Sequence, residues 1–315
     1  MLDDIRARGH VRCGVSAGAI GFSVAEKNQE WHGMNADLCR ALATAVVGSA
    51  GKVVFVAVPS SRRIAALTER EVDILVRQTP RTFSRDLEHR QRFVAPFYHG
   101  GHGFLTRKSN GLASALELSG ATVCLIAGSG GERAATRFFE RHGMKFTAVR
   151  SETWSEVRQN YKAKRCLVLA ADTVWLAHMR EQLSGEGGPH IMLPELIDAE
   201  IFGPYVLDHQ PRWKRIVQWT IYGLIAAEDV GIKQSNAGAA ATSSNPEIRY
   251  LAGADGTIGR ALGLAPDWLM QVVARIGNYG EIFERHLGRN SRLQLARGRN
   301  ALVRKGGLML APAFR

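Results

Sequence analysis

Polar side chains gather directly after an apolar, strand-like segment between residues 72 and 85. The segment VDILV, residues 72–76, leads into RQTPRTFSR, which supplies amide, hydroxyl and guanidinium groups. Open α/β sheets bind small ligands at the carboxyl ends of their strands. Arg85 closes this segment, and its planar guanidinium can grip a carboxylate through two charge-assisted hydrogen bonds. The segment therefore indicates a carboxylate site, and a surface loop with scattered basic residues is the alternative that these residues alone leave open.

Strand-like and helix-like segments alternate along the chain, which indicates an α/β fold with mostly parallel strands. The order restarts after an apolar crossing segment near 101–108, and a second crossing follows near 203–208. We therefore expect one discontinuous lobe, made of 1–105 and of 207–315 with its C-terminal helical extension. The other lobe, 106–206, is inserted into it. Hinge-linked lobes of this kind close over a ligand.

The composition is that of an ordinary globular protein, with 45% hydrophobic and 22% charged residues in a chain of 315. No apolar run approaches the roughly 18 residues of a membrane span. The net charge of +12 is spread evenly, without a helix-turn-helix, a zinc finger or an aromatic-interleaved basic stripe. We therefore expect no nucleic-acid partner and interpret the charge as a solvated surface that attracts anionic ligands.

The chain contains four cysteines, and their spacing does not suggest a metal site. No Cys-x-x-Cys spacing occurs, and no His stands close enough to complete a zinc set, so we expect neither a metal nor another cofactor. Four cysteines allow three disulfide pairings, and free buried cysteines in a cytosolic protein are the alternative from composition alone. No basic-then-apolar leader opens the chain, so we expect any signal peptide to be missing from this sequence.

Several motifs resemble those of the polar amino-acid family of bacterial extracellular solute-binding proteins, and within it the general L-amino-acid-binding proteins of ABC importers. The segments that carry the resemblance span nearly the whole chain. They are VDILVRQTPRTFSR, RFVAPFY, LELSGATVC, LPELI, WTIYGLIAAEDVGI and IGNYGEIFER. For the last of these we expect a structural, helical role without ligand contact.

The resemblance implies the type II periplasmic-binding-protein fold, in which two α/β lobes are joined by a two-strand hinge and the ligand cleft lies between them. It implies a periplasmic protein that captures an amino acid without catalysis and delivers it to an ABC transporter permease, and we expect a monomer. It also implies two disulfides formed in an oxidising compartment. A two-lobed fold favours one bond in each lobe, Cys13–Cys39 and Cys124–Cys166.

The resemblance also assigns the groups that would hold a zwitterionic amino acid. Arg85 matches the family's carboxylate-binding Arg, and an ion pair with Asp86 is the structural alternative. Asp172 matches the acid that receives the ligand's ammonium, and a helix N-cap is the alternative there. Ser129 and Gly130 lie at a strand-to-helix turn whose backbone N–H groups could reach the carboxylate. A glycine-rich turn with Ser129 as a plain N-cap is the alternative.

The chain also departs from the family's pattern at several positions around this site. Pro80 stands where the family usually has Thr or Ser, and it can offer neither a hydroxyl nor a backbone N–H, which leaves Gln78 and Thr82 available. The positions of the family's two clamping aromatic rings match Ala19 and Ser60. Losing both rings opens the pocket and removes apolar stacking.

The site is also more basic than the family's pattern. Arg81 lies beside it in the sequence, and Arg62, Arg63 and Arg77 could lie near the cleft, although a solvated surface explains each of them individually. Two Thr positions of the family have become Gly130 and Gly131. A larger, more basic pocket predicts an acidic or longer ligand, such as a glutamate-like compound or a γ-glutamyl peptide like glutathione.

Two other functional classes share this architecture. A periplasmic dehydratase of the arogenate or prephenate type would need a poised acid or base, for which His32, His99 and His102 are the loose histidine candidates. None has a partner at an interpretable spacing, so we expect surface or hinge histidines and no enzyme. A ligand-sensing receptor domain would need a membrane span or a signalling module, and the sequence shows neither.

Overall fold

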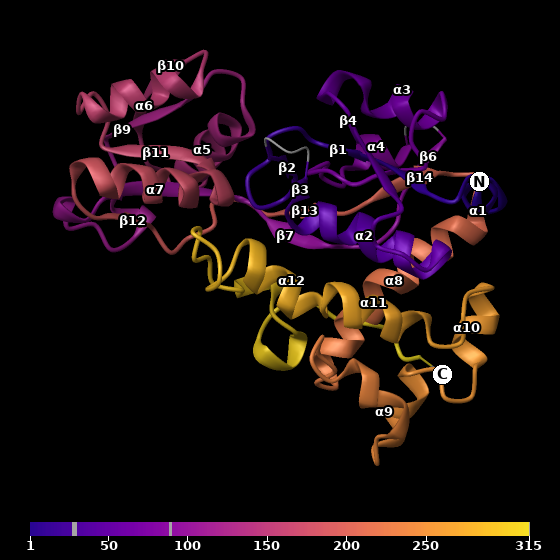
Figure 1. The fold of residues 1–315 in the computed structure, drawn as a ribbon. Helices are drawn as coiled ribbons and strands as arrows, with labels where there is room; N and C mark the ends of the chain where they lie inside the picture. The colour runs from indigo at the N-terminus through magenta and orange to yellow at the C-terminus, as the bar shows by residue number, and fades with distance from the viewer. Residues whose placement is uncertain (27–29, 88–89, 315) are drawn as a thin grey trace. The chain divides into compact units, whose positions relative to one another are not determined.

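The computed structural model describes residues 1–26, 30–87 and 90–314. The chain forms two units (Figure 1), and we name them by their residues. Unit 1 comprises Met1–His99, Ile201–Ser291 and Ala296–Arg315, and unit 2 comprises Gly100–Glu200 and Arg292–Leu295. In the described part of the chain, no helix has the length and apolar character needed to cross a membrane.

Unit 1 contains a five-stranded sheet in the order β4-β1-β5-β14-β6. Strand β1 pairs in parallel with β4 and β5, whereas β14 runs antiparallel to β5 and β6. The parallel strands are rich in Val and Ile, which suit a pleated and buried surface. The strands of this sheet are β1 (Val11–Val15), β4 (Val53–Ala57), β5 (Ile74–Leu75), β6 (Gln91–Phe93) and β14 (Tyr205–Leu207). Strands β2 (Val24–Ala25) and β3 (Trp31–His32) form a separate two-stranded sheet. The α-helices described before residue 90 are α1 (Leu2–Arg8), α2 (Met34–Val47), α3 (Arg63–Thr68) and α4 (Phe83–Leu87).

Unit 2 contains a second five-stranded sheet, in the order β10-β9-β11-β8-β12. The two faces of this sheet pack into two separate hydrophobic cores. Val123 and Leu125 of β9 pack with helix α5 on one face, whereas Cys124 packs with α6 and α7 on the other. Helix α5 therefore covers one face of this sheet and α6 and α7 cover the other. The elements are β8 (His102–Arg107), β9 (Ala121–Ile126), β10 (Phe146–Ser151), β11 (Val168–Asp172), β12 (His190–Met192), α5 (Gly130–Arg141), α6 (Trp154–Lys162) and α7 (Thr173–Gly187).

Two disulfides confirm the pairing that the resemblance implies. Cys13 of β1 bonds to Cys39 of α2, with 6.1 Å between their Cα atoms. Cys124 of β9 bonds to Cys166, just before β11, with 5.6 Å between Cα atoms. Each bond lies within one unit and ties a sheet strand to the helix or strand beside it.

The chain passes between the units at two strands that pair with each other, β7 (Tyr98–Gly100) and β13 (Glu200–Phe202). After β14 the chain is mainly helical, as expected for the C-terminal extension. Its helices are α8 (Pro211–Asp229), α9 (Pro246–Leu251), α10 (Thr257–Leu262), α11 (Trp268–Ile276) and α12 (Tyr279–His286).

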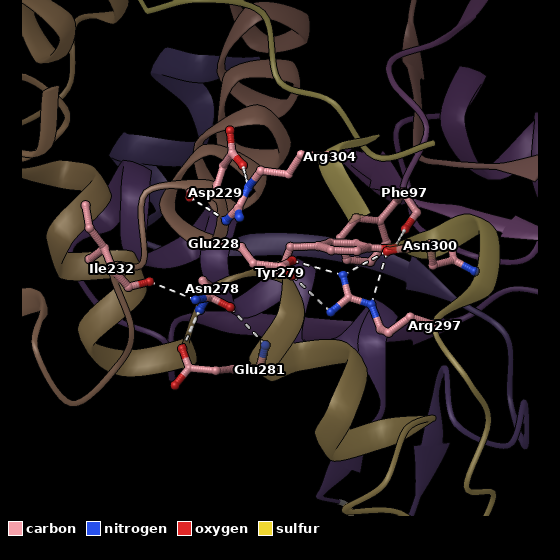
Figure 2. A network of polar contacts seen from close by, with 10 residues as sticks. All are labelled: Phe97, Glu228, Asp229, Ile232, Asn278, Tyr279, Glu281, Arg297, Asn300 and Arg304. Atoms are coloured by element: carbon pink, nitrogen blue, oxygen red, sulfur yellow. Dashed lines mark hydrogen bonds and ion pairs between the residues drawn. The ribbon is translucent and has the colours of Figure 1, made fainter. Parts of the chain in front are cut away.

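The C-terminal region holds the backbone of the first crossing strand and of the residue before it. The amide of Asn300 forms two bonds with His99, accepting from its N–H at 2.7 Å and donating to its carbonyl at 2.9 Å. The hydroxyl of Tyr279 donates to the carbonyl of Phe97 at 2.9 Å (Figure 2). Asn300 thus gives His99 the same two bonds that a neighbouring strand would give.

An ion pair and a helix cap keep this contact in place. Arg297 lies over the ring of Tyr279, with 5.3 Å to the ring centre, and pairs with Glu228 at 2.9 Å. Asn278 caps α12 and forms a capping box with Glu281, which fixes the helix start beside Tyr279. The IGNYGEIFER segment therefore has the helical, structural role expected from the sequence.

Replacing Asn300 with Ala should lower the free energy of unfolding by about 2 kcal/mol, because two backbone groups of His99 lose their partners. Asn300 is only 4% exposed, so water cannot easily replace its amide. Urea denaturation of the variant and the wild type measures the difference. Asn290→Ala, at an exposed position, serves as the control and should change stability by no more than about 0.5 kcal/mol. Equal stability of the two variants would show that Asn300 does not hold β7.

Candidate functional site

The residues expected to bind the ligand fall into two groups, one in each unit. Each group follows a strand of its own five-stranded sheet, where open α/β sheets bind ligands. The unit 1 group, after β5, contains Gln78, Arg81, Thr82 and Arg85; the unit 2 group contains Ser129 and Gly130 after β9 and Asp172 at the end of β11.

Arg85 lies on the short helix α4 and is partly buried. Its Nη1 donates to the backbone oxygen of Pro80 at 2.6 Å. The ion pair with Asp86 that the sequence left open is not formed, because Asp86 pairs instead with Arg81, with 2.7 Å between Oδ2 and Nη2. Among the described residues Arg85 has no acidic partner, so its charge remains available to an anion.

Arg63 lies close enough to both Arg85 and Arg77 for its charge to interact with each of them, so the three guanidinium groups form a cluster of like charges linked through Arg63. Burial lowers the pKa of Arg77, and the charge of Arg63 lowers it further. Burial also lowers the pKa of Arg63, together with the charge of Arg85. Within the described chain none of the three pairs with a carboxylate. A bound anion would therefore relieve a repulsion that no side chain of the described residues compensates.

Neutral oxygens hold the guanidinium of Arg77 in place. It donates to the hydroxyl of Ser16 at 2.9 Å, to the carbonyl of Val58 at 2.8 Å and to the hydroxyl of Ser60 at 3.1 Å. Ser60 is one of the two positions that match the family's aromatic clamp. At this position the chain therefore has a hydroxyl that orients a cation. Ala19, at the other position, lies in a bridge to Ser23.

Gln78 borders a small cavity inside unit 1. Its Oε1 accepts from Ser16 at 3.3 Å, while its Nε2 and the Nδ2 of Asn35 are buried without a described partner. Both amides line the cavity, which leaves about 10 Å³ for the centre of a water molecule. One water fits that space and would satisfy both amide groups. Gln78 is thus directed at least in part into the interior of unit 1.

Pro80, the main departure from the family's pattern, contributes its carbonyl. That oxygen accepts from Arg85 and, at 3.1 Å, from the hydroxyl of Tyr205. Burial raises the pKa of Tyr205 to about 12, so this phenol stays protonated and remains a donor. Thr82 is exposed, and its Oγ1 accepts from the backbone N–H of Arg85 at 3.3 Å. Arg81 is exposed as well, but its charge is engaged by Asp86.

In unit 2, both helix-capping alternatives are realised. Asp172 caps α7, with its Oδ1 accepting from the N–H of Trp175 at 2.9 Å. Ser129 caps α5, with its Oγ accepting from the N–H of Glu132 at 3.1 Å. A carboxylate has about four acceptor positions, so one capping bond leaves Asp172 able to accept from a ligand.

The glycines at the start of α5 are required by close packing. A Cβ on Gly131 would lie 2.9 Å from the carbonyl oxygen of Ala170 in β11. A Cβ on Gly130 would lie 2.8 Å from Nε2 of His102 in β8. The space of a side chain at position 130 is therefore already occupied by an imidazole ring.

His102 is buried and therefore not a surface histidine, one of the two alternatives that the sequence suggested. It is 7% exposed, and its Nδ1 lies 3.0 Å from both carboxylate oxygens of Asp198. Burial alone would lower the pKa of His102, but the hydrogen bond and charge of Asp198, with the charges of Glu200 and Asp172, outweigh burial and raise it. The same bond lowers the pKa of Asp198 against the effect of its own burial.

The other two candidate histidines have no comparable arrangement. His32 is exposed, with its Nε2 3.6 Å from a carboxylate oxygen of Glu26. His99 is engaged through its backbone by Asn300, and burial lowers the pKa of its ring. We assign no metal to the cluster of His102, Asp198 and Glu200, because Nδ1 of His102 already donates to Asp198.

Comparison with known proteins identifies the family. The model of bacterial extracellular solute-binding proteins, family 3, matches residues 11–305. The chain is 40% identical over 316 residues to the general L-amino acid-binding periplasmic protein AapJ of Rhizobium johnstonii, covering 100% of this chain and 92% of the relative. It is 40% identical over 315 residues to the glutamate/glutamine/aspartate/asparagine-binding protein BztA of Rhodobacter capsulatus, covering 100% and 93%.

The structure is similar to an ABC transporter periplasmic binding protein from Brucella ovis with glutathione bound. The TM-score is 0.87 at 39% identity, and the match covers 100% of this chain and 99% of the other. Both comparisons agree with the two five-stranded sheets and the paired crossing strands, and they confirm the type II periplasmic-binding-protein fold. The chain belongs to family 3 of the bacterial extracellular solute-binding proteins, the polar amino-acid-binding proteins of that class.

Proposed function

We propose that this protein captures an acidic amino acid or a γ-glutamyl peptide in the periplasm and delivers it, unchanged, to an ABC transporter permease. The two units act as the two lobes expected from the sequence, about 1–105 with 207–315 and 106–206, and they close over the ligand. The named relatives AapJ and BztA are amino-acid-binding proteins, which supports binding without catalysis. We propose that the protein works as a monomer.

The cluster of Arg63, Arg77 and Arg85 carries this proposal. A single α-carboxylate needs one guanidinium, whereas three guanidiniums without an acidic partner suit a ligand with more than one carboxylate. The relatives agree with this chemistry, since BztA is named for glutamate and aspartate among its ligands and the Brucella protein holds glutathione. We propose that Arg85 binds the α-carboxylate and that Arg77, with Arg63, binds a second carboxylate.

The remaining expected residues complete the site. In unit 2, Asp172 receives the ligand's ammonium, and the backbone at Ser129 and Gly130 contributes N–H groups to the carboxylate. In unit 1, Thr82 is exposed beside Arg85 and offers its hydroxyl to the ligand. Gln78 and Arg81 have smaller roles, because Gln78 bonds to Ser16 and Arg81 pairs with Asp86.

A thermal-shift and calorimetric screen tests the ligand class. The screen contains the common amino acids, glutathione, other γ-glutamyl peptides, and arogenate and prephenate as possible substrates. When all compounds are tested at the same concentration, acidic and γ-glutamyl compounds should stabilise the protein most. A compound present at 100 times its Kd stabilises the folded protein by about 2.7 kcal/mol. Prephenate and arogenate should be recovered unchanged. Preference for Leu or Phe over every acidic compound would refute the role of the arginine cluster.

A further inference from the structure

We propose that His102 binds a carboxylate of the ligand, together with the first N–H groups of helix α5. This inference rests on the proposed function and adds a specific residue and a charge preference to the binding surface of unit 2. All of the atoms that carry it belong to unit 2.

The sheet places His102 next to the start of α5. Side chains alternate along β8 and β11, and Phe104 and Ala170 belong to the core on the α5 side. His102 and Asp172 follow the same alternation and pair directly across these two strands. Both side chains therefore emerge on the α5 side of the sheet, at the strand ends where helix α5 begins.

The ring is held in one orientation with one nitrogen left for a ligand. Nδ1 lies 3.0 Å from both carboxylate oxygens of Asp198, and the backbone N–H of His102 donates to Asp198 Oδ1 at 2.7 Å. Nδ1 must therefore carry a proton, and Nε2 points to the start of α5. Nε2 has no hydrogen-bond partner among the described residues, although the side chain of His102 is only 9% exposed.

The surroundings of Nε2 favour an anion. Helix α5 is 12 residues long, and its first N–H groups, those of Gly130 and Gly131, have no acceptor in the described structure. Such a helix start attracts negative charge. The charged groups near the imidazole are Asp198, Glu200, Asp172, Arg133 and Arg137, and the three acids raise the pKa of the ring against the effect of its burial. A protonated Nε2 would donate to a carboxylate, while Asp172 beside it receives the ammonium.

The test compares His102→Asn with the wild type by calorimetry, with L-glutamate and S-methylglutathione as probes. The amide of Asn can still donate to Asp198, as Nδ1 does, but it has no group in the place of Nε2. Affinity for at least one probe should fall about 10- to 100-fold, the loss of a charge-assisted hydrogen bond. His142→Asn, the same change at an exposed position of unit 2, should leave affinity unchanged.

The pH profile separates a binding role from a structural one. As pH rises from 6 to 9, the ratio of wild-type to His102→Asn affinity should fall, because Nε2 loses its proton. A purely structural role predicts a constant ratio. Asp198→Asn keeps the hydrogen bond but removes the charge, so its affinity should be reduced at pH 7.5 and restored near pH 5.5.

Three outcomes would overturn the inference. If the wild type binds a probe and both His102→Asn and Asp198→Asn bind it equally well, His102 makes no ligand contact and the proposed function stands. If the affinity ratio does not change with pH, the effect of His102 is structural. If the wild type binds neither probe, the proposed acidic ligand and the inference fail together.

Discussion

The Arg85→Ala variant should bind L-glutamate and glutathione at least about 30-fold more weakly than the wild type. Truncating one partner of a hydrogen-bonded charge pair costs roughly 2–5 kcal/mol, because the other charge is left in the site unpaired. Arg85→Lys keeps the charge but loses the planar fork, so its affinity should lie between the two. Isothermal titration calorimetry measures all three Kd values at the same pH and salt concentration.

Two comparisons show whether this loss is specific. The ligand-free Arg85→Ala variant should keep its stability within about 0.5 kcal/mol, because among the described residues the side chain of Arg85 donates only to the carbonyl of Pro80. Arg212→Ala removes an exposed arginine of the same unit and should not change the Kd. Unchanged affinity in Arg85→Ala would move the carboxylate site away from helix α4.

Replacing Cys124 and Cys166 with Ser should lower the free energy of unfolding by about 4 kcal/mol. The bond closes a loop with a sequence separation of 42 residues, and a loop of that size restricts the unfolded chain by about that amount. Urea denaturation followed by tryptophan fluorescence measures the change. Unit 2 supplies a local probe, since the rings of Trp154 and Trp175 stack with 3.8 Å between their centres.

The other disulfide provides the matched comparison. Cys13 and Cys39 are 26 residues apart, and their double Ser variant should lose about 3.5 kcal/mol. Its fluorescence change at Trp154 and Trp175 should stay close to that of the wild type, because this bond lies in unit 1. A loss below about 1 kcal/mol in both double variants would contradict the loop-closure argument.

The sequence predicts local structure well where a physical signal is also local. Apolar runs with β-branched residues, such as those of β4 and β9, form strands, and Pro211 begins the long helix α8 at a position that suits proline. The cysteine pairing could be predicted from the family resemblance. Spacing alone left three pairings open, since Cys124 and Cys166 are far apart in the chain.

The parts that escaped prediction depend on residues far apart in the chain. His102 and Asp198 are separated by 96 positions, and no spacing rule links a histidine to an acid at that distance. Asn300 binds the backbone of His99, which lies 201 positions earlier in the chain. The sequence does not show that these two residues come together, because only folding brings them into contact. A short-range pair was also missed: Asp86 is next to Arg85, yet it pairs with Arg81 across one turn of chain.

The contact between Asn300 and His99 has a consequence for the order in which the chain matures. Ribosomes and export machinery release a polypeptide from its first residue onward, so His99 emerges long before Asn300. Nearly all of unit 2, residues 100–200, is available to fold on its own before Asn300 emerges. The sheet of unit 1, by contrast, cannot be completed until β14 has been synthesised and has inserted between β5 and β6. The backbone of His99 in the crossing strand β7 lacks one bonding partner until Asn300 is available. A prematurely terminated chain would thus carry a finished second unit attached to an unfinished first one.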